Sequence, residues 1–176
     1  MKQIALLRAV NVAGKNKIKM TDLCTSLEDL GFSNVTSYIQ SGNIVFESPN
    51  EYTTNIDLIK HKIKDDFDLD IDLTVIYRKR LECVINNSEF LKSDYELSSL
   101  YYCFLFDKPE SNNIQEIKDK ATMDEEIILN RDMAYLYCPN GLGKSKITTN
   151  LIESKLKVPS TMRSHNTILN LLELSK

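Results

Sequence analysis

The sequence lacks the features that would place the protein in a membrane or outside the cell. No apolar run approaches the ~20 residues that a membrane-spanning helix needs. The first run, Ile4 to Leu7, is too short for a signal peptide, and no cleavage site follows it. The cysteines are far apart and form no C-x-x-C pair: Cys24, Cys83, Cys103 and Cys138. We therefore expect a cytoplasmic protein with reduced, buried thiols and no membrane partner.

Several catalytic and metal-binding patterns are also missing. The two histidines, His61 and His165, form no H-x-x-x-H pattern and no cluster with cysteine, and no pair of acidic residues lies on an obvious active loop. The acidic run between residues 65 and 72 lacks the glycine and the terminal glutamate of a calcium loop, which favours a solvated turn. The sequence thus predicts no metal site. It leaves open whether the protein is an enzyme and whether it uses a cofactor.

A basic overall charge is absent too. The formal net charge is −3, although 27% of the residues are charged and 42% are hydrophobic, as in an ordinary globular protein. This balance argues against a protein that binds nucleic acid over its whole surface, and it still permits a local basic site.

What is present is a regular alternation of strand and helix patterns. In the first half, strand-like segments lie at 4–7, 35–40, 44–46 and 71–75, and apolar residues recur at helical spacing over 21–30 and 56–67. Thr21 or Asp22 can cap the first helix, and Gly31 suits the left-handed turn that ends it. This order is the ferredoxin-like βαββαβ plan.

The second half repeats the plan as far as its second helix. A strand at 101–106, a helix at 114–120, a hairpin over 125–138 and a helix up to Leu156 are predicted, but a final strand is not; Val158-Pro159 leads instead to a terminal helix. We therefore expect an α+β fold made by tandem duplication of ferredoxin-like units. The first unit spans 1–80; the second, with a joining helix and a C-terminal helix, spans 81–176 and is altered at its C-terminal end.

Two basic, glycine-containing loops follow a strand and precede a helix. When Asn11 is laid on Asn140, four further pairs coincide: Gly14 with Gly143, Lys15 with Lys144, Lys17 with Lys146, and Ile18 with Ile147. Amides at a helix start, together with lysines, can bind anions. The candidate ligand-binding residues here are Arg8, Asn11, Lys15, Lys17, Lys144, Ser145 and Lys146. The alternative is that both loops are ordinary solvated turns.

The expected topology suggests how the two loops could lie close together. Loops after the first and third strands of a ferredoxin-like unit leave the same end of its sheet, so both basic loops could face one cleft between the halves. A P-loop is disfavoured for the second loop, because Cys138 stands where the first glycine is needed and the expected sheet is not parallel.

Three further polar residues have two interpretations each. Gln40 and Asn43 flank the Ser41-Gly42 hairpin turn, where they either serve turn chemistry or contact the polar edge of a ligand. Arg163, at the predicted start of the last helix, either grips a phosphate or carboxylate or forms a salt bridge that docks the helix. Ser164 is the predicted cap of that helix.

Four stretches carry a resemblance to a known family. ALLRAVNVAGKNKIKM, TSYIQSGNIVF, YLYCPNGLGKSKITTNLIESKL and VPSTMRSHNTILNLLEL resemble the DUF1697 family, in the family's order. The resemblance implies a bacterial protein with two ferredoxin-like units and implies no activity. The family usually has glycine where Ala9 and Ala13 stand and Asn-Trp where Ser164-His165 stand, so these positions can alter a binding site.

The sequence favours binding of an anionic small molecule or nucleotide by the two basic loops. An enzyme of this kind would act by electrostatic stabilisation and positioning, because no activated nucleophile is visible. One alternative is a single-stranded nucleic-acid-binding module that stacks bases on the strand tyrosines, Tyr38, Tyr101, Tyr102, Tyr135 and Tyr137, although the K/R-G-F/Y-G/A-F-V pattern is missing. The other is a protein-interaction module without catalysis. The reaction, ligand and oligomeric state stay open.

Overall fold

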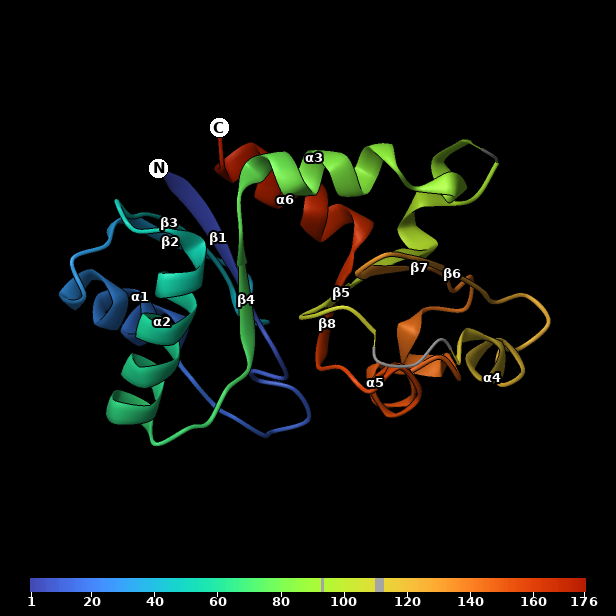
Figure 1. Cartoon of the computed structure of the whole chain (residues 1–176), viewed down its shortest axis with the longest axis horizontal. Coiled ribbons are helices and arrows are strands. Elements are labelled where there is room, and N and C mark those ends of the chain that lie inside the picture. Colours follow the sequence, from blue (N-terminus) through green and yellow to red (C-terminus); the bar gives the residue numbers. More distant parts are fainter. Residues whose placement is uncertain (93, 110–112) are drawn as a thin grey trace. The chain divides into compact units, whose positions relative to one another are not determined.

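The computed structural model describes residues 1–92, 94–109 and 113–176, which divide into two compact units (Figure 1). The first unit comprises Met1–Glu82 together with Asn170–Lys176, and the second comprises Cys83–Leu169. The sequence-based boundary at residue 80 did not assign the last residues of the chain to the first unit.

The first unit follows the βαββαβ plan. Its elements are β1 (Lys2–Leu7), α1 (Met20–Asp29), β2 (Ser33–Tyr38), β3 (Asn43–Glu47), α2 (Tyr52–Phe67) and β4 (Leu73–Ile76). The four strands form an antiparallel sheet in the order β2-β3-β1-β4. Gly31 adopts a φ of 86° just after α1, as predicted for a left-handed helix end.

The second unit repeats this topology strand for strand. Its elements are β5 (Leu100–Leu105), α4 (Ile114–Lys118), β6 (Glu126–Asn130), β7 (Met133–Tyr137), α5 (Thr149–Leu156) and β8 (Ser160–Ser164). The sheet order is β6-β7-β5-β8, which matches the first unit position by position. The predicted α+β duplication is therefore confirmed.

The final strand of the second unit corrects the sequence-based expectation that this strand is missing. β8 pairs with β5 from Tyr101↔Ser164 to Leu105↔Ser160. Met162 is its single apolar residue, so the segment shows none of the alternation by which a strand is recognised. The conformation of β8 is set by its pairing with β5 and not by its own strand propensity, which is common for edge strands.

A helix follows each βαββαβ set, and short 3₁₀ turns complete the chain. These elements are α3 (Arg78–Asn86) after β4, η1 (Glu89–Lys92), η2 (Leu97–Ser99), η3 (Leu142–Lys144) and α6 (His165–Leu174) after β8. Within the described residues, no helix is both long and apolar enough to cross a membrane.

Each unit has its own hydrophobic core between its sheet and its pair of helices. In the first unit, α1 and α2 lie on one face of the sheet (Figure 1), and Leu23 of α1 and Ile59 of α2 pack in one cluster with Ala5 of β1. In the second unit, Ile152 of α5 packs in a cluster with Cys103 of β5. Each fully buried Leu or Ile side chain contributes about 1.5–3 kcal/mol, so the cores hold the loops described below in place.

Candidate functional site

The first basic loop folds into a miniature hairpin between β1 and α1. Val12 and Lys15 form an isolated β-bridge, in which the amide of Lys15 donates to the carbonyl of Val12 at 3.0 Å. The two residues between them, Ala13 and Gly14, have φ values of 50° and 77°. Positive φ at both central positions is the signature of a type I′ turn. The loop is therefore a built turn rather than a flexible connection.

Asn11 fixes this hairpin with its side chain. Its Nδ2 donates to the carbonyls of Ile18 at 2.8 Å and Gln40 at 2.9 Å, and its Oδ1 accepts from the amide of Ile18 at 3.0 Å. The oxygen and the nitrogen of the Asn11 side chain are thus both hydrogen-bonded to the backbone. Asn11 positions the loop against the β2–β3 turn, which is a structural role for a predicted ligand-binding residue.

The β2–β3 turn is packed closely against the end of β1. The amide of Leu7 donates to the carbonyl of Gly42 at 2.8 Å, and a Cβ at Gly42 would lie 2.7 Å from the Cβ of Leu7. Asn43 is buried, and its Nδ2 donates to the carbonyl of Tyr38 at 3.1 Å and to Ser41 Oγ at 3.0 Å. The geometry of Asn43 agrees with turn chemistry, whereas Gln40 is exposed.

An open depression of about 490 Å³ lies where this loop, the β2–β3 turn and the start of α1 meet. Lys17 and Lys19 stand at its edge, and Lys15 is exposed on the same loop. Of the predicted site residues, the depression brings together Asn11, Lys17 and Gln40; its full lining is Asn11, Gly14, Lys17, Ile18, Lys19 and Gln40. Arg8 is half-buried just after β1, and its amide donates to the carbonyl of Asp72 at 2.8 Å.

The start of α1 at this depression has no side-chain cap. Lys19 occupies the N-cap position and makes no capping hydrogen bond, so neither predicted cap, Thr21 nor Asp22, fills that role. Lys19 instead forms an ion pair with Asp22, with a distance of 3.5 Å between Nζ and Oδ1. The positive end of the helix dipole therefore has no side-chain cap, and Asp22 is the one acidic residue in its first turn.

The second basic loop has a different construction. Gly141 donates its amide to the carbonyl of Cys138 at 3.0 Å, the 3₁₀ turn η3 follows, and Thr148 caps α5 by accepting from the amide of Leu151 at 3.2 Å. Ser145 is buried, and its Oγ accepts from the amide of Ile147 at 3.0 Å. The remaining predicted residues of this loop, Lys144 and Lys146, are exposed.

An acidic residue that the sequence analysis missed fills this second loop. Glu125 is only 9% exposed, and its Oε2 accepts from the amide of Thr122 at 2.9 Å. Burial alone would raise the pKa of the Glu125 carboxyl, but hydrogen bonds from the Ser145 hydroxyl, Thr122 and the backbone of Lys146 outweigh it and lower the pKa. A negative charge of the chain therefore lies beside this loop and opposes the binding of an external anion. A lone glutamate in a polar connection gave no signal in the sequence.

The sequence alignment of the two loops pairs residues of the same role at Ile18 and Ile147, but it pairs residues of different roles at Asn11 and Asn140. Ile18 and Ile147 are both buried, two residues before α1 and α5. The side chain that accepts from the amide of this isoleucine is Asn11 in the first loop and Ser145 in the second. Asn140, the aligned partner of Asn11, is exposed. In both loops a side chain accepts from the isoleucine amide, but the residue that accepts differs.

Arg163 lies on β8 and not at the start of a helix, because the sequence analysis did not predict that strand. It is buried, and its Nη1 donates to Thr161 Oγ1 at 2.7 Å and to the carbonyl of Met162 at 2.8 Å. Burial lowers the pKa of its guanidinium to about 10, so the group still carries its charge at neutral pH. Ser164 accepts from the amide of Thr167 at 3.3 Å and caps α6 as predicted.

A buried aromatic pair joins β5 to the first turn of α6. The hydroxyl of Tyr102 lies 2.7 Å from Nδ1 of His165, and both side chains are at least 95% buried. Burial raises the pKa of Tyr102 to about 12 and lowers the pKa of His165. At neutral pH both groups are uncharged, so the hydrogen bond joins a phenol hydroxyl to a neutral imidazole.

The strand tyrosines offer little surface for stacking a base. Tyr102 and Tyr135 are buried, and Tyr38, Tyr101 and Tyr137 are half-buried. Tyr102 and Tyr135 contact each other edge to face, with ring centroids 5.8 Å apart. Among the described residues, no group of three or more His, Cys, Asp or Glu side chains could hold a metal ion, and all four cysteines are free.

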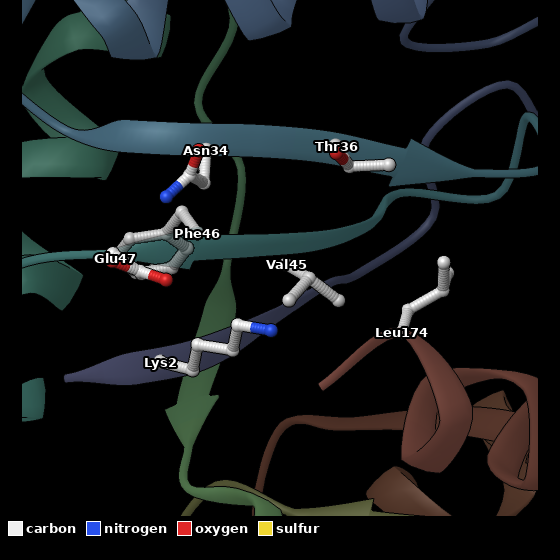
Figure 2. Close-up of a pocket in the computed structure, with 7 residues that line it drawn as sticks. All are labelled: Lys2, Asn34, Thr36, Val45, Phe46, Glu47 and Leu174. Atoms are coloured by element: carbon white, nitrogen blue, oxygen red, sulfur yellow. The ribbon is translucent and has the colours of Figure 1, made fainter. Parts of the chain in front are cut away.

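A second depression of the first unit contains none of the predicted residues. It has a volume of about 280 Å³ and lies among β1, β2, β3 and the end of α6 (Figure 2). Lys2 and Glu47, which are register partners, line it together with Leu174, and Lys2 Nζ donates to the carbonyl of Lys176. The full lining is Lys2, Asn34, Thr36, Val45, Phe46, Glu47 and Leu174.

Comparison with known proteins agrees with this architecture. The structure is similar to that of the conserved bacterial protein SP0830 from Streptococcus pneumoniae, with a TM-score of 0.72, 21% sequence identity, and coverage of 99% of this chain and 98% of that chain. No curated protein matches the sequence. The model of DUF1697, described as a protein of unknown function, matches residues 1–135. The chain therefore belongs to the DUF1697 family.

Proposed function

We propose that the protein binds an anionic small molecule or nucleotide at the depression formed by the first basic loop, the β2–β3 turn and the start of α1. The observation that carries this proposal is the difference between the two loops. At the first, an uncapped helix start adjoins an open depression edged by Lys17 and Lys19. At the second, Thr148 caps the helix, and the negative charge of the nearby Glu125 carboxylate opposes an external anion.

The chemistry of the first depression suits an anion that also has a polar edge. Lys15 and Lys17 supply positive charge, and the open end of α1 adds about half an elementary charge. The exposed amide of Gln40 can donate to or accept from a polar group attached to the anion. Asn11 and the I′ turn hold the loop in place before a ligand arrives, which lowers the entropic cost of binding. That both basic loops face one cleft stays a prediction.

The test is a melting experiment with inorganic phosphate, pyrophosphate, and nucleoside mono- and triphosphates. A ligand at a hundred times its Kd adds about 2.7 kcal/mol to the free energy of unfolding. Each kcal/mol raises the melting temperature of a chain of this size by about 2–4 °C. We expect Lys17→Ala to weaken binding about fivefold, which is the effect of losing roughly 1 kcal/mol of solvent-exposed charge interaction.

Lys144→Ala is the matched control, because it removes an exposed lysine from the loop beside which Glu125 places a negative charge. A ligand shift that Lys17→Ala leaves unchanged, or one that Lys144→Ala reduces as much as Lys17→Ala does, would contradict the proposal. Single-stranded oligonucleotides at two salt concentrations form a separate arm, since affinity that falls steeply with salt would support the nucleic-acid module instead.

A further inference from the structure

Two exposed aliphatic side chains flank the hydrogen bond that joins the first basic loop to the β2–β3 turn. Val12 is 55% exposed and Ile39 is 52% exposed. The bond itself runs from Asn11 Nδ2 to the carbonyl of Gln40 at 2.9 Å. Val12 follows the donor residue in the chain, and Ile39 precedes the acceptor residue. The two loops therefore present large apolar side chains to solvent at the place where they are tied together.

The register of the sheet places both side chains beside the first depression. Asn43 of β3 is the register partner of both Leu6 of β1 and Tyr38 of β2, so β1 and β2 end at the same edge of the sheet. The loop after β1 and the turn after β2 leave that edge together. The chain neighbours of Val12 and Ile39, on which the joining bond is made, both line the depression. Each aliphatic residue is thus one position away from its wall.

The backbone of Ile39 adopts a conformation that its side chain disfavours. Its φ is 51°, in the left-handed region that a β-branched residue rarely occupies. Glycine or asparagine would adopt this conformation at a lower cost and would leave less apolar surface in water. Ile39 is therefore unfavourable for folding on two counts. Residues in such strained conformations concentrate at sites that bind ligands, which points to a role for this side chain in binding.

The depression is larger than an inorganic anion requires. Its volume of about 490 Å³ is within the range of pockets that hold small organic ligands, and a phosphate ion would fill a small part of it. The positive charge belongs to the basic loop, where the Lys17 side chain passes Gly14: a Cβ at Gly14 would lie 3.9 Å from Lys17 Cε. The opposite loop contributes the amide of Gln40. An anion held at Lys17 leaves room for an attached organic group.

We propose that the ligand of this depression is a nucleotide, whose base packs against Ile39 and directs its polar edge to Gln40 while Lys17 and the start of α1 hold its phosphate. This inference rests on the proposed function and narrows it to one class of anion. A base has apolar faces and a polar edge, and the consecutive residues Ile39 and Gln40 offer a contact for each. A sugar phosphate is polar throughout and would gain nothing from the exposed isoleucine.

The experiment compares three probes by isothermal titration calorimetry: adenosine monophosphate, ribose 5-phosphate and inorganic phosphate. We expect the nucleotide to bind most tightly. Ile39→Gly should weaken its binding about five- to tenfold, because roughly half of an isoleucine side chain is left to bury. The same variant should bind the other two probes as the wild type does. Lys17→Ala should weaken all three by a similar factor, since each contains the phosphate.

Two controls separate the loss of the apolar contact from a change in the fold. Ile39→Asn also suits a left-handed residue, so it preserves the turn and should reproduce the effect of Ile39→Gly. Leu97→Ala removes a similarly exposed aliphatic side chain, 49% exposed in η2 of the second unit, and should leave all three affinities unchanged. Circular dichroism spectra that match the wild type show that each variant is folded.

Failure of this inference and failure of the proposed function give different results. Equal affinity for the nucleotide and for ribose 5-phosphate would overturn the role of the base and leave the anion site standing. The same holds if Ile39→Gly weakens phosphate as much as it weakens the nucleotide. If the wild type binds none of the three probes, both proposals are wrong.

Discussion

Single residues in the first loop have conformations that their side chains disfavour. Ala9 and Ala13 have φ values of 53° and 50°, in the left-handed region where an alanine costs about 1–2 kcal/mol. The sequence resemblance pointed to these two positions, because relatives usually have glycine there. The structure supplies the reason, since a type I′ turn requires positive φ at Ala13.

Ala13→Gly should therefore stabilise the protein. Relief of the left-handed strain exceeds the extra entropy that glycine has in the unfolded chain, which leaves a gain of about 0.5–1 kcal/mol. At this chain length the gain corresponds to a rise of about 1–4 °C in melting temperature. Ala121→Gly is the control, because Ala121 has a negative φ and should lose stability. A lower melting temperature for Ala13→Gly would contradict the strain that we infer.

At the scale of elements, alternation and turn residues were enough to predict the first unit but not β8 or the start of α1. Strands β1, β3 and β4 have apolar runs or alternation, whereas β8 is Ser-Thr-Met-Arg-Ser and exists because β5 offers a free edge. The helix α1 begins at Met20 without the polar cap on which the prediction relied. The pairing of β8 with β5 and the uncapped start of α1 leave no trace in the spacing of apolar residues, so that spacing does not predict them.

His165, at the junction of β8 and α6, makes the stability of the fold depend on pH. Burial lowers the pKa of His165 from its ordinary value of 6.5, so the unfolded chain takes up this proton more readily than the folded chain. The stabilisation is complete above pH 6.5 and decreases as the pH falls below that value.

His165→Gln should flatten the pH dependence of stability below pH 6.5. Urea unfolding followed by circular dichroism measures it without a tryptophan, which the chain lacks. His61→Gln provides the comparison, because His61 is exposed on α2. An unchanged slope for His165→Gln would show that the buried imidazole does not resist protonation.

At the scale of the whole molecule, the last residues of the chain complete the first unit. The Arg78 guanidinium donates to the carbonyl of Leu172, Lys2 donates to that of Lys176, and Leu174 lines the depression beside Val45 (Figure 2). These partners are far apart in the sequence, and no periodic pattern relates them. The sequence therefore predicted two units but could not assign this terminal segment to the first.

Deletion of residues 170–176 should accelerate amide hydrogen exchange in β1 and β3 several-fold, with a smaller change in β7. The reason is the loss of hydrogen bonds to the carbonyls of Leu172 and Lys176, each of which contributes about 0.5–1.5 kcal/mol. Lys176→Ala removes only a side chain and keeps the carbonyl that Lys2 contacts, so its exchange should match that of the wild type. Faster exchange confined to the second unit would contradict the assignment.

The different partners of Ile18 and Ile147 agree with the different places of the two loops in the repeated plan. A carboxamide seven residues upstream satisfies one of these amides, and a hydroxyl two residues upstream satisfies the other. Ile18 precedes the first helix of its unit and Ile147 precedes the second helix of its own, so the two loops are not equivalent positions of the duplication. Their similar sequences meet the same local requirement, an acceptor for the amide two residues before a helix, and a structural superposition of the two halves would not place them together.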